Sequence, residues 1–154
     1  MNHPFILMLT FMSIFISSAS SCSTDDYMFN IENLTPMPNG KIKIKVNTQT
    51  FTATLLDNSS AKAFKEMLPV TMNMIELNNN EKYYNLPNRL PTNSSNPGTI
   101  KNGDLMLYGS NTLVLFYKTF STSYSYTKLG SIDDVAGLEA ALGSGNVTVT
   151  FEPE

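Results

Sequence analysis

From residue 41 onward the chain consists of short segments in which apolar and polar residues alternate. The clearest is 41–46 (KIKIKV), where three β-branched side chains share one face and three lysines share the other. This period of two is typical of a β-strand with one buried face. Further strands are predicted at residues 50–56, 70–77, 82–86, 127–132 and 146–151, with two more within 105–119 around a turn at 109–111.

Two short helices are predicted among these strands. The first covers 59–68, with Asp57 or Asn58 as its N-cap, and the second ends at residue 142, with Asp133 and Asp134 expected to cap its start. Eight short strands and two helices within about 113 residues predict a mainly β fold. We expect one domain at 41–154, a closed or nearly closed barrel of about eight strands whose ends are covered by the helices.

The first 40 residues lack the alternating pattern. Residues 5–16 (FILMLTFMSIFI) form an apolar run that suits the core of a signal peptide and is shorter than the roughly 17 to 25 residues that span a bilayer. The small residues that follow, directly before Cys22, resemble the lipobox of bacterial lipoproteins, in which the cysteine carries the lipid. We therefore predict a signal peptide at 1–21, lipidation of Cys22 and a flexible tether over 22–40.

These features predict export and attachment to a membrane of the bacterial cell envelope through the lipid on Cys22. Two alternatives remain for the same segment. An ordinary secretory signal would leave the protein periplasmic or secreted, with Cys22 as a free thiol, and an uncleaved segment would act as an apolar anchor.

Composition restricts the chemistry of the mature chain. His3 and Cys22 are the chain's single histidine and single cysteine, so removal of the signal leaves about 133 residues without histidine. This excludes Ser-His-Asp and Cys-His nucleophile systems, zinc sites built on His or Cys, and a disulfide within the chain. A net charge of -3 and a pI of about 5.1 argue against nucleic acid as a partner. No metal or cofactor is predicted, because no carboxylates have a suitable spacing.

Two long stretches resemble a known family. Residues 90–134 (LPTNSSNPGTIKNGDLMLYGSNTLVLFYKTFSTSYSYTKLGSIDD) are similar to the core of bacterial cyclophilin-like fold proteins, and 41–69 resembles the opening of the same family. The resemblance covers about residues 41–151 and implies a cyclophilin-like barrel. Cyclophilins that isomerise prolyl bonds use a Phe-x-Arg-Ile-x-Pro strand, a Gln-Gly-Gly-type segment and a pocket with Trp and His. The mature chain matches none of these, so the catalytic residues cannot be transferred to any position.

Arg89, the chain's single arginine, is the one catalytic candidate. Prolyl isomerisation needs no proton transfer to a leaving group, and an arginine in an apolar pocket can donate a hydrogen bond to the prolyl nitrogen. On this hypothesis the protein is a diverged peptidyl-prolyl isomerase that acts on envelope proteins. The alternative is that Arg89 is a solvated residue of the proline-rich loop at 87–98.

Tyr124 and Tyr126 are the candidates for ligand binding. They lie in a polar connection, 120–126 (FSTSYSY), and we expect them to rim a groove for an extended peptide or a small ligand, with Arg89 contributing. The alternative is that they shield a barrel edge with their hydroxyls in water. In 113–117 (LVLFY) we expect alternate residues to fill the barrel and the others to pack under a helix.

The sequence thus predicts an exported, lipid-anchored, cyclophilin-like barrel. A non-catalytic module that binds a peptide or a small ligand is the favoured function, and the diverged isomerase is the alternative.

Overall fold

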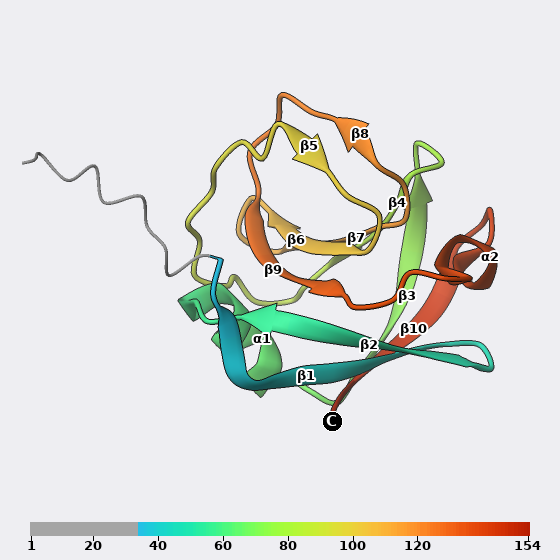
Figure 1. Cartoon of the computed structure of the whole chain (residues 1–154), viewed down its shortest axis with the longest axis horizontal. Helices are drawn as coiled ribbons and strands as arrows, with labels where there is room; N and C mark the ends of the chain where they lie inside the picture. Colours follow the sequence, from blue (N-terminus) through green and yellow to red (C-terminus); the bar gives the residue numbers. More distant parts are fainter. Residues whose placement is uncertain (1–33) are drawn as a thin grey trace, which may run out of the picture.

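The computed structural model describes residues 34–154, and eight of its strands close into a barrel. These strands are β1 (Pro36–Val46), β2 (Gln49–Leu56), β3 (Val70–Leu77), β4 (Glu81–Asn85), β6 (Asp104–Tyr108), β7 (Thr112–Phe116), β9 (Thr127–Ile132) and β10 (Val147–Pro153). Their order around the barrel is β1-β10-β3-β4-β7-β6-β9-β2, and all neighbouring pairs are antiparallel (Figure 1). The predicted mainly β fold with a closed eight-stranded barrel is confirmed.

The alternation of apolar residues fills the barrel. Ile42, Ile44 and Val46 of β1 are completely buried, and they join one core with inward residues of the other strands. A barrel of eight strands has an interior just wide enough for its own side chains, so this core leaves the middle of the barrel packed.

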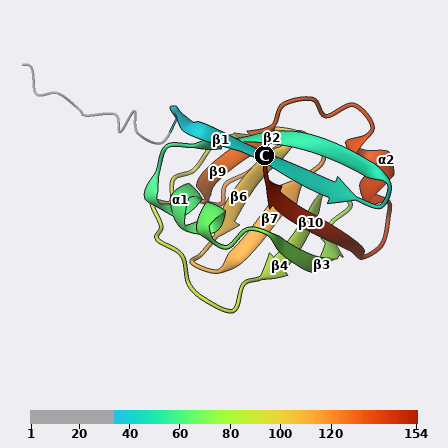
Figure 2. The same cartoon turned by 90° about the horizontal axis from the view of Figure 1, so that it is seen from below.

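Two helices cover opposite ends of the barrel (Figures 1 and 2). In α1 (Ser59–Glu66) the Asn58 side chain caps the first turn by accepting a hydrogen bond from the Ala61 amide at 2.8 Å. Phe64 of α1 meets Phe151 edge to face, with ring centroids 5.5 Å apart. The helix ends at Glu66, two residues before the predicted end, and α2 (Leu138–Leu142) packs its apolar side chains into the same core.

The prediction that Asp133 and Asp134 cap α2 is wrong. The residue at the N-cap of α2 is Gly137, which has a left-handed conformation. Asp133 instead accepts hydrogen bonds from Lys41 Nζ at 2.5 Å and Thr54 Oγ1 at 2.6 Å, and Asp134 accepts one from the Ala136 amide. The carboxylate of Asp133 is therefore used by the neighbouring strands β1 and β2, and the helix begins one turn later.

The predicted tether is too long at its C-terminal end. Residues 36–40 belong to β1, and Pro36 pairs with Leu56 before a register shift that is completed at Lys41. This irregularity accommodates Pro36, Pro38 and Gly40. Gly40 is needed there because an added Cβ would lie 2.7 Å from Met37 Cβ and 2.9 Å from the Leu55 carbonyl oxygen. The predicted signal peptide and Cys22 lie outside the described residues.

A separate two-stranded sheet, β5 (Thr99–Ile100) paired with β8 (Phe120–Ser121), lies against the outside of the barrel. Its apolar residues pack on the outward side chains of β6 and β7 in a second cluster, formed by Ile100, Met106, Val114, Phe116, Phe120, Tyr126 and Tyr83. The outward residues of β7 are thus covered by the β5–β8 sheet and Tyr126. The prediction that they pack under a helix is wrong. Within residues 34–154 neither helix has the length and apolar character to cross a membrane.

Candidate functional site

A cavity of about 520 Å³ lies on the outside of the barrel, between the barrel wall and the segment 119–126. Outward-facing side chains of three adjacent strands form its floor: Glu81, Tyr83 and Asn85 of β4, Thr112 and Val114 of β7, and Tyr108 at the end of β6. Residues 120–124 and Tyr126 form its roof, and Leu77 and Asn78 lie at its rim. Its size is typical of sites for small ligands or short peptide segments.

Strand alternation determines which side chains reach this floor. In β4 the residues Glu81, Tyr83 and Asn85 share the outward face, while Lys82 and Tyr84 pack towards the barrel interior. The register places Tyr83 opposite Val114 and Asn85 opposite Thr112. The polar part of the floor is tied together by a hydrogen bond of 2.9 Å from Thr112 Oγ1 to Asn85 Oδ1.

The roof is held by backbone pairing with the proline-rich loop. Ser95 and Tyr126 form an isolated bridge, with two N–H···O bonds of 3.0 Å. The Thr122 amide donates to the Gly98 carbonyl at 2.9 Å, and the Asn96 side chain donates to the Ser123 carbonyl at 3.2 Å. The loop at 87–98 therefore acts as a support for the roof.

Aromatic contacts hold the roof against the barrel wall. Phe116 lies 5.5 Å from Tyr126 and 5.7 Å from Phe120, measured between ring centroids. Tyr108 meets Tyr124 at 6.2 Å and Tyr126 at 5.6 Å. Aromatic pairs at such separations contribute about 0.5–1.5 kcal/mol each beyond their buried area.

The structure places the two predicted tyrosines in this cavity and leaves Arg89 outside it. Tyr124 is exposed, whereas Tyr126 is buried at the inner end of the roof, and both belong to the lining. Arg89 is exposed in the loop 87–98 and is not one of the residues that line the cavity. The arginine required by the isomerase hypothesis is thus not among the side chains that line this cavity.

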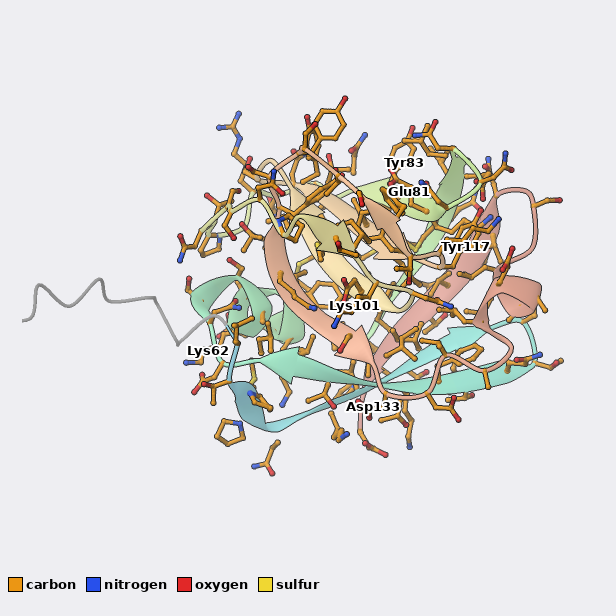
Figure 3. The ribbon with its side chains drawn as sticks, turned by 45° about the horizontal axis from the view of Figure 1, so that its top comes forward. Lys62, Glu81, Tyr83, Lys101, Tyr117 and Asp133 are labelled. Atoms are coloured by element: carbon orange, nitrogen blue, oxygen red, sulfur yellow. The ribbon has the colours of Figure 1, made fainter. Side chains whose placement is uncertain are left out.

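Glu81 was not predicted to be a site residue, although its position could have suggested it. It shares its strand face with Tyr83, and Figure 3 shows the two side chains next to each other on β4. Burial and the negative charge of Glu76 raise the pKa of the Glu81 carboxyl to about 6. Burial and the charge of Glu81 also raise the pKa of Tyr126. Both residues line the cavity, so the charge of the Glu81 carboxylate acts on the Tyr126 phenol within it.

A buried ion pair lies on the other side of the same wall. Lys82 is completely buried, and its ammonium group donates hydrogen bonds to the Glu76 carboxylate and, at 2.7 Å each, to the carbonyls of Gly143 and Gly145. The Tyr117 hydroxyl donates to the same carboxylate at 2.8 Å. Burial alone would raise the pKa of Glu76, but the bonds from Lys82 and Tyr117 outweigh it and hold the pKa below its usual 4.5. This network ties β3 and β4 to the turn between α2 and β10.

The described residues contain no grouping of three or more His, Cys, Asp or Glu side chains that could hold a metal ion. In the cavity itself, the carboxylate of Glu81 is surrounded by aromatic, amide and hydroxyl side chains. Such a surface supplies hydrogen bonds, one negative charge and aromatic faces, which are the means of binding a ligand.

Two comparisons with known proteins give a match. The family described as "Cyclophilin-like family" matches residues 44–152. The solution structure of the hypothetical protein AF2241 from Archaeoglobus fulgidus is similar at 15% sequence identity, with a TM-score of 0.57 over 74% of this chain and 94% of that chain. A search of curated proteins finds no match. At this level of identity the archaeal structure supports the fold alone.

Replacing Lys82 tests the buried network. In Lys82→Met the Glu76 carboxylate and two carbonyls lose their buried donor, so the free energy of unfolding should fall by about 3–5 kcal/mol. Urea denaturation measures this change. Lys118→Met is the control, because the exposed pair of Lys118 with Glu139 should contribute less than about 1 kcal/mol. Equal losses in the two variants would contradict the role given to Lys82.

Replacing Glu81 tests whether its charge opposes folding. A carboxyl whose pKa is raised to about 6 binds its proton more tightly in the folded state than in the unfolded state. Its contribution to stability is therefore greatest below its ordinary pKa of 4.5 and is lost as the pH rises through about 6.

Glu81→Gln should accordingly raise the free energy of unfolding by up to about 1 kcal/mol at about pH 7.5, after allowance for solvent screening. Below about pH 4.5 the gain should vanish. Urea denaturation at the two pH values measures it, with Glu66→Gln on the exposed face of α1 as the matched control. A gain of the same size at both pH values would refute this description of Glu81.

Proposed function

Because the chain belongs to the cyclophilin-like family, we propose that it uses this fold as a binding module, with the cavity under residues 119–126 as its ligand site. The ligand is a small molecule or a short extended segment of peptide. The barrel itself provides a rigid wall, and the ligand lies against the outside of that wall.

The single observation that carries this proposal is the position of the exposed apolar side chains. Five large hydrophobic residues are exposed in the described chain, and three of them, Leu77, Tyr108 and Tyr124, line this one cavity. A fourth, Ile75, pairs across the strands with Tyr83 of the cavity floor. Apolar residues gathered around a concave site are typical of interaction surfaces.

Binding without catalysis is the function that the placement of Arg89 favours. Prolyl isomerisation requires a donor aimed at the prolyl nitrogen inside an apolar pocket. Arg89 is exposed and lies outside the lining, and the cavity's one charged side chain is a carboxylate, which cannot act as such a donor when ionised.

We place this module in the bacterial cell envelope, exported by the segment 1–21 and attached to a membrane by a lipid on Cys22. The support is the sequence alone: an apolar run of signal-peptide length and a series of small residues directly before the cysteine. A free cysteine would be open to oxidation outside the cell, whereas a lipid on its sulfur removes that thiol.

The binding proposal is tested by a screen of short peptides and aromatic fragments against the ¹⁵N-labelled full chain. Ligands should shift amide signals of residues 81–85 and 120–126. Tyr108→Ala and Tyr124→Ala should each weaken binding about tenfold, the loss expected for one aromatic contact of about 1.4 kcal/mol. Both side chains lie outside the barrel core, so the barrel should still fold, and the loss includes the aromatic contacts by which these rings hold the roof.

Leu34→Ala is the control for this screen, because Leu34 is also an exposed apolar residue and lies outside the cavity. Binding that shifts other regions, or that is insensitive to both tyrosine variants, would overturn the proposed site. A screen without any ligand for these residues would count against the binding function.

The lipid proposal is tested by mass spectrometry of the protein recovered from bacterial membranes. The wild-type chain should begin at Cys22 and carry the added mass of acyl chains, and Cys22→Ala should lose that added mass and leave the membrane fraction. An unmodified wild-type cysteine would show that the lipid anchor is absent.

A further inference from the structure

One charge in the cavity is left uncompensated by the rest of the described chain. Among the lining residues, Glu81 is the one with a formally charged side chain, and it takes part in none of the ion pairs of residues 34–154. The lysine next to it in sequence, Lys82, points into the barrel and is bound to Glu76. Figure 3 shows Lys62 and Lys101 well apart from Glu81.

A partly buried carboxylate without a cation opposes folding. Nothing in the barrel requires a charge at this position, since the neighbouring outward residues of β4, Tyr83 and Asn85, are neutral. Residues that oppose folding while facing a cavity are typical of binding sites.

Tyrosine rings share the lining of the cavity with this carboxylate. Tyr108 and Tyr124 are nearly perpendicular to each other, at 88°, and Tyr108 and Tyr126 are inclined at 52°. Rings in several planes present both faces and edges to the cavity, and a face attracts a cation through its quadrupole. The rings and the carboxylate thus favour the same sign of charge in a ligand.

From this geometry we infer that the cavity binds an organic cation, an ammonium or guanidinium group carried on an apolar body, with Glu81 as its counter-ion. The inference rests on the binding function proposed above and adds the charge of the ligand to it. The apolar body lies against the lining residues Leu77, Val114 and Phe120, and the cation faces Glu81 and the phenols. A lysine or arginine side chain of a peptide and a free amine share this chemistry.

Three probes of the same shape separate charge from apolar contact: 4-phenylbutylamine, 4-phenylbutan-1-ol and 4-phenylbutyrate. Each is titrated into the ¹⁵N-labelled full chain at about neutral pH, and the dissociation constant is taken from the shifts of residues 81–85 and 120–126. The amine should bind about tenfold more tightly than the alcohol, as expected for one charge-assisted hydrogen bond, and the carboxylate should bind most weakly.

The same titrations with Glu81→Gln should abolish the preference for the amine and leave the affinity for the alcohol unchanged. Glu66→Gln, which removes the same charge from α1, should leave all three affinities unchanged. An amine that binds no more tightly than the alcohol, or that keeps its advantage in Glu81→Gln, overturns the inference while the binding site itself stands. Absence of binding by all three probes at millimolar concentration also overturns it, and the peptide and fragment screen then decides the binding function separately.

The pH dependence gives a second test. Through the barrel wall the charge of Glu81 acts on Glu76 of β3 and on Tyr117 beyond the end of β7, and Tyr83, Tyr108, Tyr124 and Tyr126 line the same cavity as Glu81. Burial raises the pKa of the Tyr117 and Tyr126 phenols, and the bonds from Lys82 and Tyr117 lower the pKa of Glu76, so these three groups keep their charge state near neutral pH. The pKa of Glu81 is raised to about 6, so its carboxyl gains a proton between about pH 7.5 and 5, and amine binding should weaken about tenfold at the lower pH.

In Glu81→Gln the affinity for the amine should be the same at both pH values, and a persistent pH dependence in this variant would refute the role of Glu81. The source of the cation is distinguished with two dipeptides, acetyl-Phe-Lys-amide and the same peptide acetylated on the lysine Nζ. A peptide ligand is indicated if the unmodified dipeptide binds more tightly than 4-phenylbutylamine, and a small amine is indicated by the reverse order. Equal binding of the two dipeptides contradicts the inference.

Discussion

The arrangement of the site depends on one strand that is apolar on both faces. Leu113 and Leu115 of β7 point into the barrel, and Val114 and Phe116 point out of it, yet all four are buried. An apolar outer face on a closed barrel has to be covered, because an exposed row of such side chains loses the stabilisation of burial, about 25 cal/mol per Å². The segment 119–126 and Ile100 of β5 supply the cover, and the cavity lies between residues 120–126 and the outward residues of β4, β6 and β7.

The charged side chain on the inner side of the β4 wall is paired, and the one on the outer side is not. Lys82 and Glu81 are adjacent in β4, so strand geometry sends one inward and the other outward. The inner charge is fully compensated by Glu76 and two carbonyls, and that compensation connects β3, β4 and the turn after α2. The outer charge has no ion-pair partner among residues 34–154. A single strand therefore carries both a stabilising ion pair and an unpaired carboxylate, for which we propose a cationic ligand.

Much of the barrel could be predicted because strand burial leaves a local pattern. The alternation in 41–46 and 70–77 correctly predicted β1 and β3 and the inward positions of Ile42 and Ile44. The start of α2 could not be predicted, because Asp133 is equally suited to cap a helix and to pair with a lysine. Its partner Lys41 lies 92 residues away in the sequence, and local pattern carries no information about such pairing.

The candidate site was predictable only where local sequence pattern marks its residues. Tyr124 and Tyr126 were identified because tyrosines in a polar connection lack an apolar neighbour in sequence, and both line the cavity. The floor was missed, since it depends on β4, β6 and β7 being neighbours in the sheet, and this order is set by long-range pairing. Glu81 lies two residues before Tyr83 in the strand, so the two share one face, and this could have indicated that Glu81 belongs to the site. A lone outward glutamate on a strand, however, is ordinarily solvated.

The location of the cavity also explains why membership of the family says little about the ligand. The interior of an eight-stranded barrel is filled by its own side chains, so a ligand has to lie outside the wall. The connecting segments form the cover over the wall, and such segments vary more in sequence than the strands they join. The archaeal structure shares the fold at 15% identity. A likeness at this level concerns the barrel and says nothing of the connecting segments. We therefore expect ligand specificity in this chain to reside in residues 119–126 and in the outward residues of β4.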